Sequence, residues 1–239
     1  MSKTNIIAML SALCILISLS SCGTTQQLVS ERRPSEIREL TVVKPITNIE
    51  IIESGNRGTY SKMETDNATA NIVDVLNRTI PTDIKIQNLK MDTTDKVVFQ
   101  RELHLLVNYV EGQQQIKGVS LSPKMLAIMN KYNQDFAIGV LEVGFARAKG
   151  NYGRQIAKGV GIGILTLGFY VPVPIKSAST MICLIVDRKN NNVAFYRKNN
   201  GQELNPTEKT VIERQLKGIL DPYFRANKPT AKKAIVNRA

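Results

Sequence analysis

Asp135-Phe-Ala-Ile-Gly-Val-Leu-Glu-Val-Gly-Phe-Ala-Arg-Ala148 is a stretch with apolar side chains at both odd and even positions. Successive side chains of a strand point to opposite faces, so both faces of this strand would be apolar. The pattern predicts a central strand that is covered on both sides. A similar strand is expected at Ala178–Val186, followed by a turn at Asp187–Asn192 and a hairpin partner at Val193–Arg197.

The segments on the N-terminal side of this hairpin alternate between strand and helix patterns. Ala68, Ile72 and Val75 lie on one face of a predicted helix that Pro81 ends. The remaining expected elements are strands at Val42–Val43, Ile49–Ile52 and Asp83–Gln87, a helix from Thr94 to Gly112, and a short helix after Ser122-Pro123. This order predicts an α/β (α+β) domain over residues 41–225, with helices packed on a mixed β-sheet.

The C-terminal part is expected to hold one helix and a tail. Asn205-Pro206-Thr207-Glu208 has the pattern of a capping box, with Pro at the first helical position. The helix that it opens would extend through Val211 to Tyr223. Residues 226–239 are polar and basic, which predicts a disordered tail.

An insert at residues 148–177 separates the two central strands. It is rich in glycine and apolar residues, and no acidic residue occurs between Val143 and Val186. Such a segment can be part of the core, an interface with a partner or second copy, or a membrane contact. The interface residues proposed on this basis are Gly161, Ile162, Ile164, Leu165, Leu167, Phe169 and Tyr170.

Residues 1–21 have the parts of a secretory signal peptide. Lys3 provides the positive start, and an apolar run of fourteen residues covers Ile6–Leu19. That run is too short to cross a bilayer as a helix, which takes about 20 residues. Residues 22–40 are mostly polar and lack periodicity, so we expect a flexible tether.

Leu19-Ser20-Ser21-Cys22 resembles the lipobox of bacterial lipoproteins. The resemblance implies cleavage after Ser21 and attachment of fatty acyl chains, such as palmitate, at Cys22. Gly23 is not the Asp that retains many lipoproteins in the inner membrane. We therefore expect a lipid anchor on the periplasmic face of the outer membrane, with the inner membrane as the lesser alternative.

The net charge limits the kinds of partner that we expect, and the cysteine content decides whether an internal disulfide is possible. The sequence has 32 Lys and Arg against 20 Asp and Glu; without Lys3, the mature chain carries 31 against 20, a net charge of +11. This favours anionic partners, but an exported protein does not meet nucleic acid. Cys183 is the only cysteine left after Cys14 is removed and Cys22 is acylated, so no internal disulfide is expected.

Catalytic and cofactor patterns are missing from the sequence. His104 is the only histidine, and it lies on a predicted helix with no ligand-like spacing around it. Glu142 is interpreted as a strand-edge or ion-pair residue. Gly159, Gly161 and Gly163 lack the Lys-Ser/Thr of a phosphate-binding loop. The expectation is therefore a protein that is not an enzyme and that has no metal and no cofactor.

The element order resembles the domain shared by the N-terminal part of TolB, by LpoB and by CsgG. The similarity is strongest between Asp135 and Tyr196, where Phe145-Ala-Arg-Ala148 ends a strand and Asp187 begins a hairpin turn. Asn190-Asn191-Asn192 replaces the usual Gly of that turn, and Asn tolerates the left-handed backbone. The resemblance implies a TolB N-terminal-domain-like fold.

The resemblance also implies a function. Members of this group act by binding, as adaptors, regulators or assembly subunits in cell-envelope biogenesis. The expected partners are the membrane, through the acyl chains on Cys22, and a periplasmic protein or a second copy. The alternative is a multimeric subunit of an export channel in the outer membrane, as in CsgG.

Overall fold

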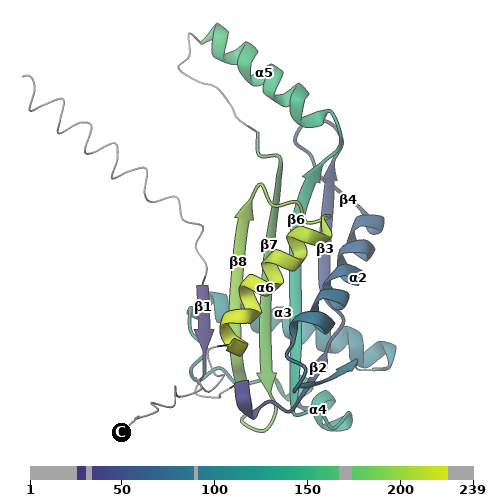
Figure 1. Ribbon diagram of the computed structural model, residues 1–239, viewed down its shortest axis with the longest axis vertical. Coiled ribbons are helices and arrows are strands. Elements are labelled where there is room, and N and C mark those ends of the chain that lie inside the picture. Colours follow the sequence, from purple (N-terminus) through teal and green to yellow (C-terminus); the bar gives the residue numbers. More distant parts are fainter. Residues whose placement is uncertain (1–25, 31–33, 89–90, 167–173, 226–239) are drawn as a thin grey trace, which may run out of the picture.

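The apolar stretch at the centre of the sequence forms β6, Phe136–Arg147, in the computed structural model. The structure describes residues 26–30, 34–88, 91–166 and 174–225. These residues contain an eight-stranded mixed sheet with helices on both faces (Figure 1). The predicted α/β class with a mixed sheet is confirmed.

The strands are ordered β1-β8-β7-β6-β2-β5, and β3 pairs with both β6 and β4. Antiparallel pairs join β6 to β7, β7 to β8 and β8 to β1, whereas β2 and β3 run parallel to β6. The other bounds are β1 Gln26–Val29, β2 Glu39–Val42, β3 Ile46–Ile52, β4 Thr59–Tyr60, β5 Lys85–Asn88, β7 Ser177–Asp187 and β8 Asn192–Gln202.

One edge of β6 is covered by two short strands in succession. β2 pairs with its beginning and β3 with its second half, from Ile46 opposite Leu141 to Ile52 opposite Arg147. Pro45 lies between the two strands and has no N–H to donate to a ladder. The break that Pro45 predicts is thus present.

The helices begin at side-chain caps that the sequence supplies. Ser61, Asp92 and Ser122 each accept a hydrogen bond from the backbone N–H three residues later, which satisfies a donor at the helix start. The bounds are α2 Lys62–Thr79, α3 Thr93–Gln113, α4 Pro123–Lys131, α5 Asn151–Leu165 and α6 Lys209–Arg225. A 3-10 turn, η1, covers Pro34–Glu36.

Two apolar clusters hold the layers together. α2 and α6 pack on one face of the sheet, with Ile138 and Val140 of β6 in their cluster. α3 and α4 pack on the other face, with Ala137 and Leu141. Gly139 lies under α3, where an added Cβ would come within 2.4 Å of the Leu103 side chain. This close approach explains a glycine in the central strand.

The predicted tether at residues 22–40 is wrong over its described part. β1 pairs with β8, and Ile37 and Leu40 are buried in the core. The polar pattern missed β1 because an edge strand is held by backbone hydrogen bonds rather than by an apolar face. Residues 1–25, which include the predicted signal peptide and Cys22, lie outside the described residues.

The C-terminal elements differ from the prediction at their boundaries. α6 begins at Lys209 instead of Pro206, because Asn205 caps a separate turn through the N–H of Thr207. β8 continues five residues past the predicted end at Arg197, since its ladder with β7 extends to Gln202. The predicted tail at 226–239 lies outside the described residues.

Candidate functional site

α5, residues 151–165, leaves the body between β6 and β7, and we call this helix the arm. Figure 1 shows it projecting past the end of the sheet. Among the described residues, no other helix or strand packs along its length. The arm therefore presents its side chains outside both core clusters.

An aliphatic stripe follows one face of the arm. Ile156, Val160 and Ile164 are spaced four residues apart, which places them on one side of a helix. Their side chains are 38%, 51% and 72% exposed, and the exposure rises toward the end of the arm. Arg154 and Lys158 lie on the opposite side and are also exposed, and Ile162 and Leu165 continue that side toward the end of the arm. The first half of the arm is thus amphipathic, and among the described residues no helix or strand covers the stripe.

Arg147 holds the base of the arm in place. Its guanidinium donates to the carbonyls of Gly55 at 2.9 Å and Ile175 at 2.8 Å, and to the side-chain oxygens of Asn56 and Asn151, both at 2.8 Å. These bonds join the end of β6, the turn after β3, the start of α5 and the chain that returns to β7. Arg147 therefore ties the base of the arm to the end of the sheet.

Gly150 makes the sharp turn into the arm. It occupies the cap position of α5 with a φ of 85°, which is a backbone conformation that glycine adopts without steric cost. Asn151 follows and is buried, with its N–H bonded to the Ala148 carbonyl. The base is thus ordered by local backbone bonds as well as by Arg147.

The residues proposed as an interface fall into two groups. Gly161, Ile162, Ile164 and Leu165 lie in the arm and are exposed, with Leu165 at 85%. The interpretation of the insert as core is wrong for these residues. The other three, Leu167, Phe169 and Tyr170, lie outside the described residues.

Sequence reasoning missed three residues of this site. Ile156 and Val160 complete the aliphatic stripe, and their four-residue spacing from Ile164 was the available signal. Arg147 carried no such signal. Three of its four partners, Gly55, Asn56 and Ile175, are distant in the sequence, and Gly55 and Ile175 contribute only a backbone carbonyl. Only the fold brings Asn56 and Ile175 next to it.

Glu142 is a buried acid, which contradicts its interpretation as an edge or ion-pair residue. It lies in the middle of β6, beneath α6, and is 0% exposed. Its Oε1 is 3.1 Å from Ser179 Oγ, which is also 3.1 Å from Gln215 Oε1. Among the residues that the structure describes, its Oε2 has no hydrogen-bond partner.

Burial raises the pKa of Glu142 to about 7, and the Ser179 hydrogen bond opposes that rise only in part. The Ser179 hydroxyl is the donor to Glu142 Oε1, and Gln215 Oε1 is a second acceptor at the same distance. Glu142, Ser179 and Gln215 include one acid and no base that could activate the Ser179 hydroxyl as a nucleophile. This cluster is a structural feature that responds to pH.

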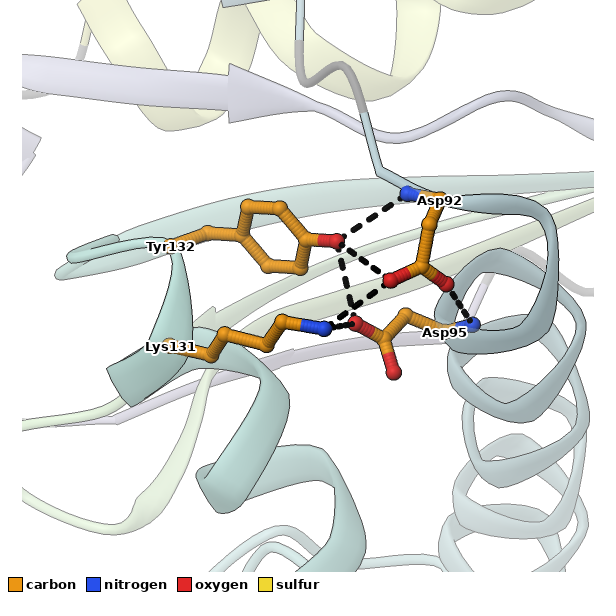
Figure 2. Close-up of polar contacts among 4 residues, drawn as sticks. All are labelled: Asp92, Asp95, Lys131 and Tyr132. Carbon is orange, nitrogen blue, oxygen red and sulfur yellow. Dashed lines mark hydrogen bonds and ion pairs between the residues drawn. The ribbon is translucent and has the colours of Figure 1, made fainter.

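A second polar cluster braces α3 against α4 (Figure 2). Lys131 Nζ lies 2.9 Å from Asp92 and 2.6 Å from Asp95, and Tyr132 Oη accepts from the Asp92 N–H at 3.0 Å. The N–H of Asp95 and the Lys131 ammonium together lower the pKa of Asp92 to about 2. One cation thus bridges both carboxylates, so the cluster links the two helices.

The other candidate groups are placed as follows. His104 lies exposed on α3, as predicted, and Cys183 is a free, buried cysteine in β7. Within the described ranges, no three His, Cys, Asp or Glu side chains gather as metal ligands would. In the same ranges, every helix is too short or too polar to cross a bilayer.

Comparisons with known proteins give distant structural matches. No family model and no curated protein sequence matches this chain. Two dodecamer structures of PelC from Paraburkholderia phytofirmans share 8% identity, with TM-scores of 0.41 and 0.40. They cover 84% of this chain and 98% and 97% of theirs.

The C-terminal domain of LpoB from Salmonella enterica is also similar. Its TM-score is 0.30 at 8% identity, over 73% of this chain and 88% of that domain. LpoB is one of the proteins that the element order resembles, so this part of the resemblance has a distant structural match. Overlap and identity this low carry no inference about function.

Proposed function

We propose that the protein is a lipid-anchored periplasmic lipoprotein that acts by binding, as an adaptor, regulator or assembly subunit in cell-envelope biogenesis. The observation that carries the proposal is the arm, a helix with an amphipathic first half that projects from a folded body with its aliphatic side chains uncovered. The lipobox-like sequence ending at Cys22 supports the anchor and the compartment.

Exposed aliphatic side chains on a fixed base favour binding. Burying one Ile, Val or Leu side chain yields about 1.5–3 kcal/mol relative to leaving it exposed. Ile164 and Leu165, which are 72% and 85% exposed, forgo most of this gain, and Val160, at 51%, forgoes about half of it. A surface of this kind, adjoined by charged residues, is typical of an interaction site.

A cysteine-accessibility experiment tests the proposal. Ile164→Cys is labelled with a membrane-impermeant maleimide, first in isolated envelope membranes and then after purification of the protein. Leu105→Cys serves as the control, because Leu105 is 54% exposed on α3, away from the arm. Native Cys183 is buried and contributes little background.

We expect Ile164→Cys to react slowly in membranes and quickly after purification, whereas Leu105→Cys reacts at similar rates in both. Equal rates for Ile164→Cys in the two preparations would overturn a binding role for the arm.

Native mass of the detergent-extracted protein distinguishes self-association from binding of a periplasmic protein. A ring of copies supports the channel-subunit alternative, and a single copy with a bound periplasmic protein supports an adaptor.

A further inference from the structure

We infer that the arm docks along an anionic bilayer surface, with its aliphatic stripe turned toward the acyl chains. The bilayer is the one that holds the acyl chains of Cys22, so the orientation rests on the proposed function. The apolar pattern and the charge of the helix do not depend on whether Cys22 is acylated. Three observations carry the inference: the amphipathic pattern, the one-sided charge and the position of the N-terminus.

The amphipathic pattern has the dimensions of a surface helix. Fifteen residues form the arm, with Ile156, Val160 and Ile164 exposed along one face. Arg154 and Lys158 extend from the other face, where their long side chains can reach the lipid headgroups. A helix that lies in the plane of the membrane surface does not have to be long enough to cross the membrane.

The charge of the segment favours an anionic surface. Arg154 and Lys158 lie in the arm, Lys149 and Lys176 are exposed at its base, and no acid occurs between Val143 and Val186. Lipid headgroups with negative charge attract such a segment, by about 1 kcal/mol for each basic side chain near the surface.

The N-terminus places a membrane at the same end of the molecule as the arm. β1 runs antiparallel to β8, with Gln26 opposite Lys198. β1 therefore begins on the side where β8 finishes and the arm leaves (Figure 1). Cys22 is four residues before Gln26, a reach of at most about 14 Å. An acylated Cys22 thus keeps this end of the sheet close to the bilayer.

A fluorescence experiment on the full chain, as extracted from cells, tests the docking. Val160→Cys carries an environment-sensitive fluorophore, and Leu105→Cys carries the same label as the control. The labelled proteins are mixed with vesicles of phosphatidylcholine alone, or with vesicles that also contain phosphatidylglycerol. We expect a blue shift at position 160 with the anionic vesicles only, a smaller shift at high salt, and no shift at position 105.

A charge variant sharpens the test. Arg154→Gln combined with Lys158→Gln should require roughly thirty-fold more anionic lipid for the same shift, because two surface attractions are lost. Lys117→Gln combined with Lys124→Gln removes the same charge at the opposite end of the sheet and should leave the titration unchanged. Equal titrations for the two double variants would overturn the inference.

The remaining outcomes separate docking from anchoring and from self-association. A blue shift that occurs without vesicles and grows with protein concentration would mean that a second copy covers the stripe, which overturns the inference. No shift with anionic vesicles would overturn it as well. Intact mass of the same preparation reports acylation of Cys22, so an unacylated protein that still docks would contradict the anchor alone.

Discussion

Raising the pH through 7 is expected to weaken the folded protein, because Glu142 must then ionise inside the core. The acid is fully buried, and within the described part of the chain its Oε2 has no hydrogen-bond partner. Substituting Glu142→Gln keeps the size and shape of the side chain but removes the ionisation. The difference between the two proteins across pH therefore isolates this one carboxyl group.

The size of the effect follows from the shift in pKa. Burial raises the pKa of Glu142 from 4.5 to about 7, and each pKa unit corresponds to about 1.4 kcal/mol. A group whose pKa is raised on folding contributes stability that is fully present below the unfolded value and is lost as pH rises through the folded value. The free energy of unfolding should thus fall by about 3 kcal/mol between pH 4.5 and pH values above 7.

Urea unfolding at a series of pH values measures this loss. Wild type and Glu142→Gln should have similar midpoints near pH 4.5, and the variant should be the more stable protein by about 3 kcal/mol above pH 7. Glu53→Gln, at an exposed position, is the matched control and should follow the wild-type curve. Parallel curves for wild type and Glu142→Gln over the whole range would refute the assignment of a raised pKa to this residue.

Three further predictions concern the anchor, the base of the arm and the tail. Cys22→Ser should stop acylation and release the protein from the outer-membrane fraction; intact mass of wild type showing a mature, unacylated N-terminus would contradict it. Arg147→Ala removes four hydrogen bonds at the base, so hydrogen exchange of α5 amides should speed up, while unchanged exchange would show that the backbone alone fixes the arm. Deleting residues 228–239 should change the melting temperature by no more than a few degrees and weaken salt-dependent binding to anionic lipid; a large loss of stability would show that these residues are docked.

The sheet and most helices could be predicted from local pattern and capping. β6 has apolar side chains on both faces because helices cover both sides of it. Ser61, Asp92 and Ser122 precede helices, and Pro45 separates two strands. These features depend on neighbours in the sequence, so the sequence displays them directly.

The features that the sequence did not reveal depend on distant partners. Glu142 looked like an edge residue because its neighbours Ser179 and Gln215 join it only through the fold. β1 has only four residues, and its pairing partner β8 is distant in the sequence. The four-residue aliphatic spacing of α5 was visible in the sequence, although glycine lowers the helix propensity of this segment.

Side-by-side melting of Ile164→Asp and Ile138→Asp tests the central claim that the arm lies outside the core. Ile164 is 72% exposed and Ile138 is 0% exposed. A surface substitution costs at most about 0.5 kcal/mol, and any cost at the end of α5 stays local, so Ile164→Asp should melt within about 2 °C of wild type. Ile138→Asp buries an unpaired carboxylate and should lose several kcal/mol or fail to fold. If Ile164→Asp unfolds as readily as Ile138→Asp, the arm is part of the core and the binding role proposed for it is wrong.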